Sequence, residues 1–301
     1  MRTLVVVWLC GAVLLQVSTC AAGEVAQPDP APYQSAEPQP RGWPLSDAER
    51  AFVLRPEHQR RPGSEQNKHL PALWPVVPSA GHWGGTSWLD THGKLVQHVA
   101  SRPGPVDFLL VGDSITQQWG SPLDGRAMNA GWTAQFGDAS VVNLGIGGDK
   151  TQNLLWRLEH GGVEGLEPRC IVLMIGNNNM FFAPETGVQP VAKGVQACLD
   201  TLRRQFPRVP VVVVKILPAH APGNAFYEHI KQANAALDPL RLDQNARVRV
   251  LDLTAEMTQP DGRLKPDLYT PDNIHLSAAG YALYAARLRP VVDELLHKTP
   301  R

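Results

Sequence analysis

From residue 88 onward, short apolar runs alternate with amphipathic stretches, and this alternation constrains the fold of the 301-residue chain more than any other feature. Each run is rich in Val, Ile or Leu and has the length of a strand. The runs are Val106 to Val111, Ser140 to Leu144, Cys170 to Ile175, Val209 to Ile216 and Val248 to Leu253. The helical stretches are Thr151 to His160, Pro190 to Phe206, Phe226 to Leu237 and Ser277 to His297. Strands that alternate with helices predict a single α/β domain, in which helices cover both faces of a parallel sheet.

The chain before this domain has a different composition. Arg2 is followed by an apolar run that is short for a membrane span, which is typical of a signal peptide, and we expect residues 1–22 to be removed. Residues 23–78 are rich in Pro, Gln, Glu and Arg, which predicts a tether or a loosely packed arm. The folded domain is then expected over residues 79–298. These features predict an exported protein, periplasmic or secreted; an alternative is a lipoprotein acylated at Cys20, which is the one route by which we expect membrane association.

Charge and cysteine content exclude two classes of protein. The chain has 28 basic and 28 acidic residues and no long run of one sign, so we expect no nucleic-acid partner. After cleavage of the signal peptide only Cys170 and Cys198 remain, and both lie in apolar patterns. Two buried thiols are therefore expected rather than a disulfide scaffold.

The residues that follow the apolar runs carry the chemistry, because open parallel sheets bind ligands beyond the carboxyl ends of their strands. Ser114 follows the first run, where a helix is expected to begin. Backbone N–H groups and the helix dipole at such a position favour a developing negative charge. A serine at this position could also serve only as a helix cap.

The second and third runs end in turns with different chemistry. Asn143 to Thr151 is rich in glycine but lacks a full G-x-G-x-x-G pattern, so a dinucleotide site is not indicated. Gly176 to Asn179 contains three consecutive carboxamides. Carboxamides donate N–H groups without carrying charge, as an oxyanion hole requires. Either segment could equally be an ordinary turn.

A carboxylate and an imidazole, Asp272 and His275, precede the last helical stretch. At this spacing the two side chains can form a hydrogen bond that orients the imidazole as a base for a serine. The pair could instead be half of a metal site, but no further ligand cluster accompanies it. We therefore expect no metal and no cofactor.

Taken in order, these segments resemble the sequence blocks of the SGNH, or GDSL-like, hydrolases over about residues 88–296. The blocks are Gly112-Asp113-Ser114, the glycine after the second run, Gly176-x-Asn178 and Asp272-x-x-His275. Residues 143–158, NLGIGGDKTQNLLWRL, further resemble the catalytic subunits of the platelet-activating-factor acetylhydrolase IB branch and its bacterial relatives. The resemblance implies a flavodoxin-like three-layer α/β/α sandwich with a five-stranded parallel sheet. An ordinary α/β-hydrolase is disfavoured because Thr116 stands where the G-x-S-x-G elbow needs glycine.

The resemblance also implies roles for individual residues. Ser114 is the expected nucleophile, His275 the base and Asp272 the residue that orients it. The expected oxyanion hole consists of the backbone N–H groups of Ser114 and Gly148 and the side-chain amide of Asn178.

Three further positions correspond to the wall of the acyl pocket in the acetylhydrolases, Ile115, Asn177 and Ile274, although Asn177 replaces the family's threonine. Two β-branched side chains make a stiff, small pocket, so acetyl is the expected acyl group. The wider family has aspartate where this chain has Asn179, which weakens any inference of substrate from the family as a whole.

We therefore predict a serine esterase that removes short acyl groups, most of all acetyl, through an acyl-enzyme. Export favours a carbohydrate or glycoside ester as substrate. Two alternatives stay open: a lipid-ester hydrolase, either acetylhydrolase-like or a lysophospholipase, and a catalytically silent binding or scaffold protein of the same fold. The sequence leaves open the alcohol half of the ester and whether the protein is a monomer or a homodimer.

Overall fold

The computed structural model describes residues 88–182 and 188–298. The predicted signal peptide (1–22) and arm (23–78) lie outside the described residues, as do the first nine residues of the predicted domain. Cys20, which would be acylated in the alternative lipoprotein, lies outside them too. No helix in the two described ranges has both the length and the apolar composition needed to cross a bilayer.

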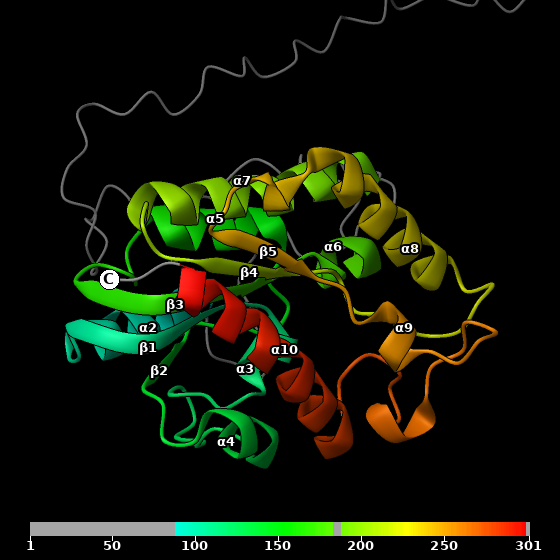
Figure 1. Cartoon of the computed structure of the whole chain (residues 1–301), viewed down its shortest axis with the longest axis horizontal. Coiled ribbons are helices and arrows are strands. Elements are labelled where there is room, and N and C mark those ends of the chain that lie inside the picture. Colours follow the sequence, from blue (N-terminus) through cyan, green and yellow to red (C-terminus); the bar gives the residue numbers. More distant parts are fainter. Residues whose placement is uncertain (1–87, 183–187, 299–301) are drawn as a thin grey trace, which may run out of the picture. The chain divides into compact units, whose positions relative to one another are not determined.

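Five parallel strands form one sheet in the order β2-β1-β3-β4-β5 (Figure 1). The strands are β1 (Gly104–Gly112), β2 (Val141–Asn143), β3 (Leu166–Met174), β4 (Val211–Val214) and β5 (Val248–Leu251). Each of the five apolar runs corresponds to one strand. The strand order is that of flavodoxin-like folds, which confirms the predicted fold class.

Helices cover both faces of this sheet. They are α2 (Trp88–Ala100), α3 (Ser114–Gln117), α4 (Ala130–Phe136), α5 (Thr151–Glu159), α6 (Asn177–Phe182), α7 (Val188–Gln205), α8 (Ala225–Leu237), α9 (Thr254–Met257) and α10 (Ala278–Lys298). Short 3-10 turns are η3 (Asp238–Leu240), η4 (Leu242–Gln244) and η5 (Pro266–Leu268). The four predicted helices are α5, α7, α8 and α10, with ends within two residues of those expected. As expected, Ser277 caps α10, since its Oγ accepts the N–H of Gly280 at 3.1 Å.

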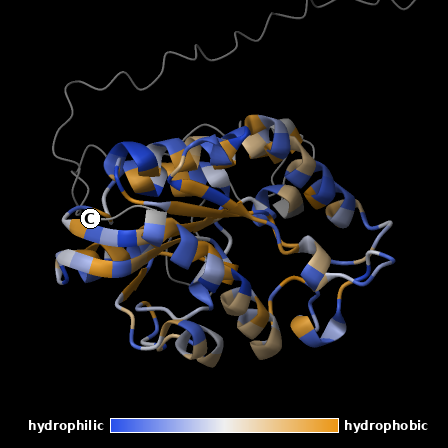
Figure 2. Ribbon diagram, in the orientation of Figure 1, coloured by the Kyte–Doolittle hydropathy of each residue, from blue (hydrophilic) through white to orange (hydrophobic). Residues whose placement is uncertain are grey.

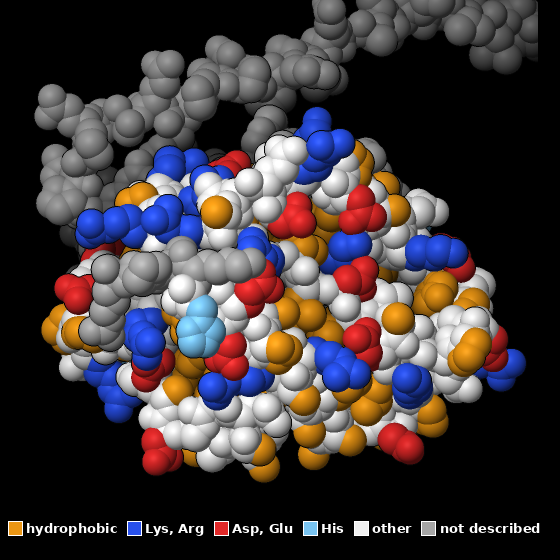
Figure 3. Space-filling view, in the orientation of Figure 1, with side chains coloured by type: hydrophobic (Ala, Val, Ile, Leu, Met, Phe, Trp, Pro, Cys, Tyr) orange, Lys and Arg blue, Asp and Glu red, His pale blue; other side chains and the backbone are white. Residues whose placement is uncertain are grey.

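The core lies in two layers, one on each face of the sheet, and Figure 1 shows α5 and α7 above the sheet with α4 and α10 below it. Successive residues of β1 alternate between the layers: Leu109 and Val111 face α2, α5 and α7, whereas Phe108 and Leu110 face α4 and α10. Figure 2 shows the resulting apolar strands between helices with polar outer faces. On the face seen in Figure 3, basic and acidic side chains are interspersed, as the zero net charge leads one to expect.

Helix α2 has no counterpart in the sequence analysis. Its residues Trp88, Leu95 and Val99 are each at most 2% exposed and belong to the core layer of α5 and α7. They are spaced by seven and four residues, a helical period that could have identified the helix. The predicted pair of buried thiols is confirmed, because Cys170 and Cys198 are both free and buried.

Candidate active site

The first strand leads directly into the predicted nucleophile. Ser114 is the first residue of α3, and Asp113 caps this helix by accepting the N–H of Ile115 at 3.0 Å. Asp113 is 0% exposed. Burial, together with the nearby charge of Asp149, raises the pKa of Asp113 to about 7, although hydrogen bonds such as that from Ile115 oppose the shift. Below that pH this carboxyl is neutral beside the nucleophile.

The predicted triad residues form a continuous chain of hydrogen bonds. The Oγ of Ser114 lies 2.9 Å from Nε2 of His275, and Nδ1 of His275 lies 2.6 Å from Oδ2 of Asp272. A carboxylate only accepts hydrogen bonds, so Nδ1 carries the proton and Nε2 is left to accept the hydroxyl proton of the serine. This arrangement is the one that a serine nucleophile and its base require.

Asp272 is held in place by its own tight turn. Its Oδ1 accepts the N–H groups of Ile274 and His275, both at 2.9 Å, and the hydroxyl of Thr270 at 2.8 Å. Partial burial acts to raise the pKa of Asp272, but the hydrogen bonds from His275, Ile274 and Thr270 outweigh it and lower the pKa below its usual range. Asp272 therefore stays a carboxylate throughout the neutral and mildly acidic range.

The loop after β2 lies against the nucleophile. Gly148 has φ of 81°, a conformation that residues with a side chain rarely adopt. Its neighbour Gly147 lies next to Ser114, with the N–H of Gly147 donating to Oε1 of Gln117 at 2.8 Å. The Nδ2 of Asn178 donates to the backbone oxygen of Asp149 at 3.0 Å, which leaves one N–H of this amide for another acceptor. The three predicted oxyanion donors thus come from the exits of β1, β2 and β3.

Asn179 has a role that sequence reasoning missed. It is 2% exposed, and its Oδ1 accepts the N–H of Thr151 at 2.9 Å while its Nδ2 donates to Oε1 of Gln152 at 2.9 Å. Asn179 therefore satisfies the first turn of α5 from another element. A signal was available, because Lys150, which precedes α5, is a poor capping residue.

The three predicted acyl-pocket residues lie in different surroundings. Ile115 is 1% exposed and packs in the core layer of α10. Ile274 is half-buried and packs against a third apolar cluster, which includes Phe226 and Ile230 of α8. Asn177 is 3% exposed, and its Oδ1 is buried without a hydrogen-bond partner. Their contact with an acyl group stays a prediction.

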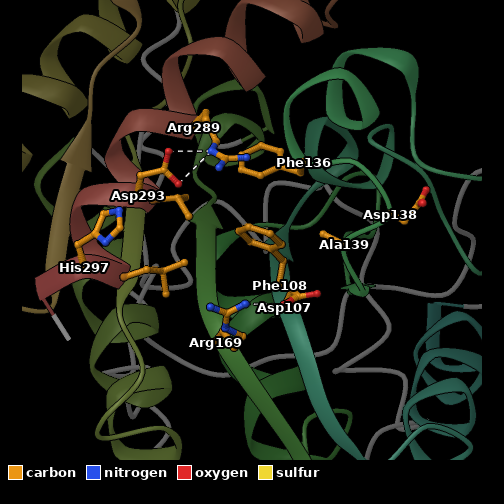
Figure 4. Close-up of a pocket in the computed structure, with 11 residues that line it drawn as sticks. Asp107, Phe108, Phe136, Asp138, Ala139, Arg169, Arg289, Asp293 and His297 are labelled. Atoms are coloured by element: carbon orange, nitrogen blue, oxygen red, sulfur yellow. Dashed lines mark hydrogen bonds and ion pairs between the residues drawn. The ribbon is translucent and has the colours of Figure 1, made fainter. Parts of the chain in front are cut away.

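A separate pocket of about 600 Å³ lies at the amino-terminal half of the sheet (Figure 4). It is lined by Asp107 of β1 and Arg169 of β3, which form an ion pair at 3.0 Å, and by Arg289, Asp293 and His297 of α10. Ser114 follows the carboxyl end of β1, at the opposite edge of the sheet, so this pocket is separate from the triad. Across residues 88–182 and 188–298, no three His, Cys, Asp or Glu side chains are grouped as metal ligands.

Comparison with known proteins identifies the family. Residues 110–283, more than half of the chain, match the model of the GDSL-like Lipase/Acylhydrolase family, and this range contains Ser114, Asn178, Asp272 and His275. The chain belongs to this family. It is accordingly a carboxylic ester hydrolase, as the sequence predicted.

The relatives agree with the predicted branch of the family. The chain is 29% identical over 221 residues to the platelet-activating factor acetylhydrolase IB subunit alpha2 of Rattus norvegicus, covering 72% of this chain and 88% of that protein. It is 30% identical over 214 residues to subunit alpha1 of Homo sapiens, covering 71% and 86%.

Solved structures agree with the predicted fold. A structure from Streptococcus pneumonia, described by reference to platelet activating factor, has a TM-score of 0.53 at 26% identity and covers 67% of this chain and 91% of its own. A structure from Bacteroides fragilis, described as an acylhydrolase, has a TM-score of 0.54 at 20% identity and covers 67% and 96%; it supports the fold alone.

Proposed function

We propose that this GDSL-like hydrolase is an exported esterase that removes short acyl groups, above all acetyl, from a carbohydrate or glycoside. The observation that carries the proposal is the contact of Ser114 Oγ with His275 Nε2 at 2.9 Å, in a histidine whose other nitrogen lies 2.6 Å from Asp272. With this geometry a serine can be deprotonated as it attacks an ester.

In the proposed acylation step, the Oγ of Ser114 attacks the ester carbonyl carbon while its proton passes to Nε2 of His275. The carbonyl oxygen becomes an oxyanion, which accepts N–H groups from Ser114, Gly148 and Asn178. Asp272 stabilises the imidazolium. When the intermediate collapses, the C–O bond to the alcohol breaks, and the proton on His275 passes to the departing alcohol oxygen.

Deacylation repeats this sequence with water as the nucleophile. Water gives its proton to His275 Nε2 as its oxygen attacks the acyl carbon, and collapse of the second intermediate releases the carboxylic acid and restores the Ser114 hydroxyl. The side chains of His275 and Asp272 are 26% and 45% exposed, so water reaches the base without a conformational change.

Two observations support a short acyl group on a large alcohol. At the predicted acyl pocket, Ile115 is 1% exposed and held in the core, and the buried amide of Asn177 would offer a long aliphatic chain a polar contact instead of an apolar one. The exposed rim formed by Asp272 and His275 leaves room for the alcohol half of the ester to extend into solvent. The apolar run after Arg2 supports export, and a polysaccharide or glycoside is an accessible substrate outside the cytoplasm.

A lipid ester is the second candidate. It is favoured by the relatives, since the proteins at 29% and 30% identity are named platelet-activating factor acetylhydrolase subunits. Both candidates share a short acyl group and differ in the alcohol half.

The experiment is a substrate panel with the purified protein: acetylated sugars, acetylated xylan, phospholipids with a short acyl chain, and p-nitrophenyl esters of increasing length. We expect kcat/KM to be highest for acetate and to fall about 10-fold or more by butyrate, because overpacking a rigid pocket costs about 1 to 3 kcal/mol. Ile274→Ala should flatten this slope, and it spares the core position Ile115. An optimum at octanoate would overturn the acetylesterase proposal in favour of a lipid ester.

The same protein should be labelled at Ser114 by an organophosphonate serine probe. Ser114→Ala should abolish labelling and essentially all turnover while the melting temperature is kept, and Ser101→Ala, an exposed serine of no proposed role, should be labelled and active like the wild type. A folded wild-type chain that resists labelling would instead favour the silent binding or scaffold protein.

A further inference from the structure

A buried guanidinium joins the carboxyl ends of two strands beside the proposed oxyanion hole. Arg157 lies in α5, and its side chain is 3% exposed. Its Nη1 donates to the backbone oxygen of Leu144, just after β2, at 2.7 Å, and its Nη2 donates to that of Gly112, the last residue of β1, at 3.2 Å. A guanidinium carries its N–H groups in one rigid plane, so these bonds fix the two strand ends relative to each other.

The same guanidinium holds a fully buried carboxylate in the loop after β2. Asp149 has a side chain that is 0% exposed, and its Oδ2 accepts Nε of Arg157 at 2.8 Å and Nη2 at 2.7 Å. Its Oδ1 accepts the indole N–H of Trp88, from α2, at 2.7 Å. Both oxygens of Asp149 are therefore tied to rigid side chains of two helices.

Each proposed oxyanion donor is connected to this ion pair, either because it is near one of the bonded residues in the sequence or because it forms a hydrogen bond with the pair. Gly112, bonded to Arg157, is two residues before Ser114. Asp149 directly follows Gly148, and its backbone oxygen accepts Nδ2 of Asn178 at 3.0 Å. The donors come from the exits of three different strands, and the Arg157–Asp149 pair forms hydrogen bonds with residues at all three exits.

We propose that the Arg157–Asp149 ion pair, steadied by Trp88, positions the three donors of the oxyanion hole. The inference rests on the proposed function, because it assumes that Ser114, Gly148 and Asn178 bind the oxyanion. The pair acts through the donors and does not touch the substrate, so Arg157 and Asp149 are positioning residues rather than catalytic ones.

The physical case for positioning rests on what a buried ion pair does and does not provide. Removing two charges from water is costly, and an apolar pair of similar size would hold two elements together at least as well. The pair provides directed bonds at fixed angles, which apolar packing lacks. Donors that must meet a developing charge lose much of their effect when they are displaced by about 1 Å.

The test is the variant Arg157→Lys, measured with p-nitrophenyl acetate. Lysine keeps the positive charge, but its single ammonium cannot reach Gly112, Leu144 and Asp149 in the same geometry. We expect kcat to fall about 30- to 100-fold, toward the effect of losing one oxyanion donor, with KM within about threefold of the wild type. Phosphonate labelling of Ser114 should slow by a similar factor, since that reaction also places a charged oxygen in the hole.

Leu202→Ala is the matched control for a loss of stability alone. Leu202 is 0% exposed in α7 and belongs to the same core layer as α5, but it is bonded to none of the three strand exits. This variant should lower the melting temperature while kcat, measured where the protein is folded, stays within about twofold of the wild type.

Trp88→Phe provides a second variant if Arg157→Lys does not fold. It keeps an aromatic ring in the core, where Trp88 packs against His92 and Trp156, and removes the bond to Asp149, so kcat, measured where the protein is folded, should fall about 3- to 10-fold with KM unchanged. Wild-type kcat in folded Arg157→Lys and Trp88→Phe, with Ser114 still labelled, would overturn this inference alone. A change in KM with kcat unchanged in these variants would also overturn the inference. Absence of labelling at Ser114 in the wild type would overturn the proposed function and this inference together.

Discussion

At the scale of single residues, two adjacent asparagines have different proposed roles: Asn178 serves catalysis and Asn179 serves stability. Asn178 is half-exposed and keeps an N–H available, whereas Asn179 is buried and caps α5. Asn178→Ala should lower kcat on the order of 100-fold, the usual effect of losing one oxyanion donor, with little change in melting temperature. Asn179→Ala should lower the free energy of unfolding by about 1 kcal/mol or more, as lost caps do. Steady-state kinetics and thermal unfolding of the two variants check the division, and the reverse pattern would contradict it.

Asp113 makes stability depend on pH. Its pKa is raised to about 7 in the folded protein, whereas an unfolded aspartate titrates near 4. Between these values the folded state binds the proton and the unfolded state does not, so stability that is fully present below about pH 4 is lost as the pH rises through about 7.

Asp113→Asn carries no titrating proton, so it should remove this slope. The stability of the variant should be closest to that of the wild type above pH 7. The difference between their free energies of unfolding should change by up to about 4 kcal/mol between pH 4 and pH 8. Urea unfolding of both proteins across this range measures it. Parallel stability profiles would show that the burial of Asp113 carries no such cost.

Sequence reasoning predicted residues that local spacing or the family blocks mark, such as Ser114, Asp272 and His275, and missed those whose partners are distant backbone atoms. Asp272 and His275 lie three residues apart, so their hydrogen bond could be predicted from spacing alone. Asp149 and Arg157 both lie in the block of residues 143–158 that resembles the acetylhydrolases, but the acceptors of Arg157 are backbone oxygens at the ends of two strands. No residue type marks a backbone oxygen, so this contact could not be predicted.

At the scale of elements, helix α3 packs directly against the loop after β2 because Gly145 in that loop has no side chain. A Cβ at Gly145 would collide with the backbone nitrogen of Gln117 in α3. Backbone cannot rotate away as a side chain can, so Gly145→Ala should push α3, and Ser114 with it, away from His275. We expect kcat/KM to fall about 10-fold or more and stability to fall by about 1 to 3 kcal/mol.

Gly125→Ala is the control for this prediction. Gly125 has φ of 71°, and a Cβ there meets no atom within 4 Å. It should lose some stability through backbone strain but keep the wild-type kcat/KM. Equal activity of the two variants would contradict the proposed role of the close approach at Gly145.

The elements that could be predicted are those with a strong period. The strands are largely buried and read as apolar runs, and α7, α8 and α10 carry long amphipathic patterns. Helix α4 was not predicted, because it spans only Ala130–Phe136 and its one fully buried side chain is Trp132. Short helices leave too few residues for a period to be recognised.

For the whole molecule, the boundary of the folded domain can be tested by truncation. A chain lacking residues 23 to about 70 should stay folded and active on p-nitrophenyl acetate, because that composition cannot form a core. A chain that begins at residue 101 loses α2, with Trp88 and Leu95 from the core. Removing even one such large side chain costs about 3 to 5 kcal/mol, so this protein should be insoluble or inactive. Insoluble protein from the first deletion would show that the segment is part of the domain.

The separation of 161 positions in the sequence between Ser114 and His275 has a consequence for the newly made polypeptide. A chain leaves the ribosome from its N-terminus, so the nucleophile and the loop of Gly148 emerge long before the base. His275 becomes available only after 161 further residues have been added to Ser114, and α10, which follows its turn, is made later still. An unfinished or C-terminally shortened polypeptide therefore carries a serine with no base. Esterase activity in a cell extract would accordingly count only molecules that extend beyond His275.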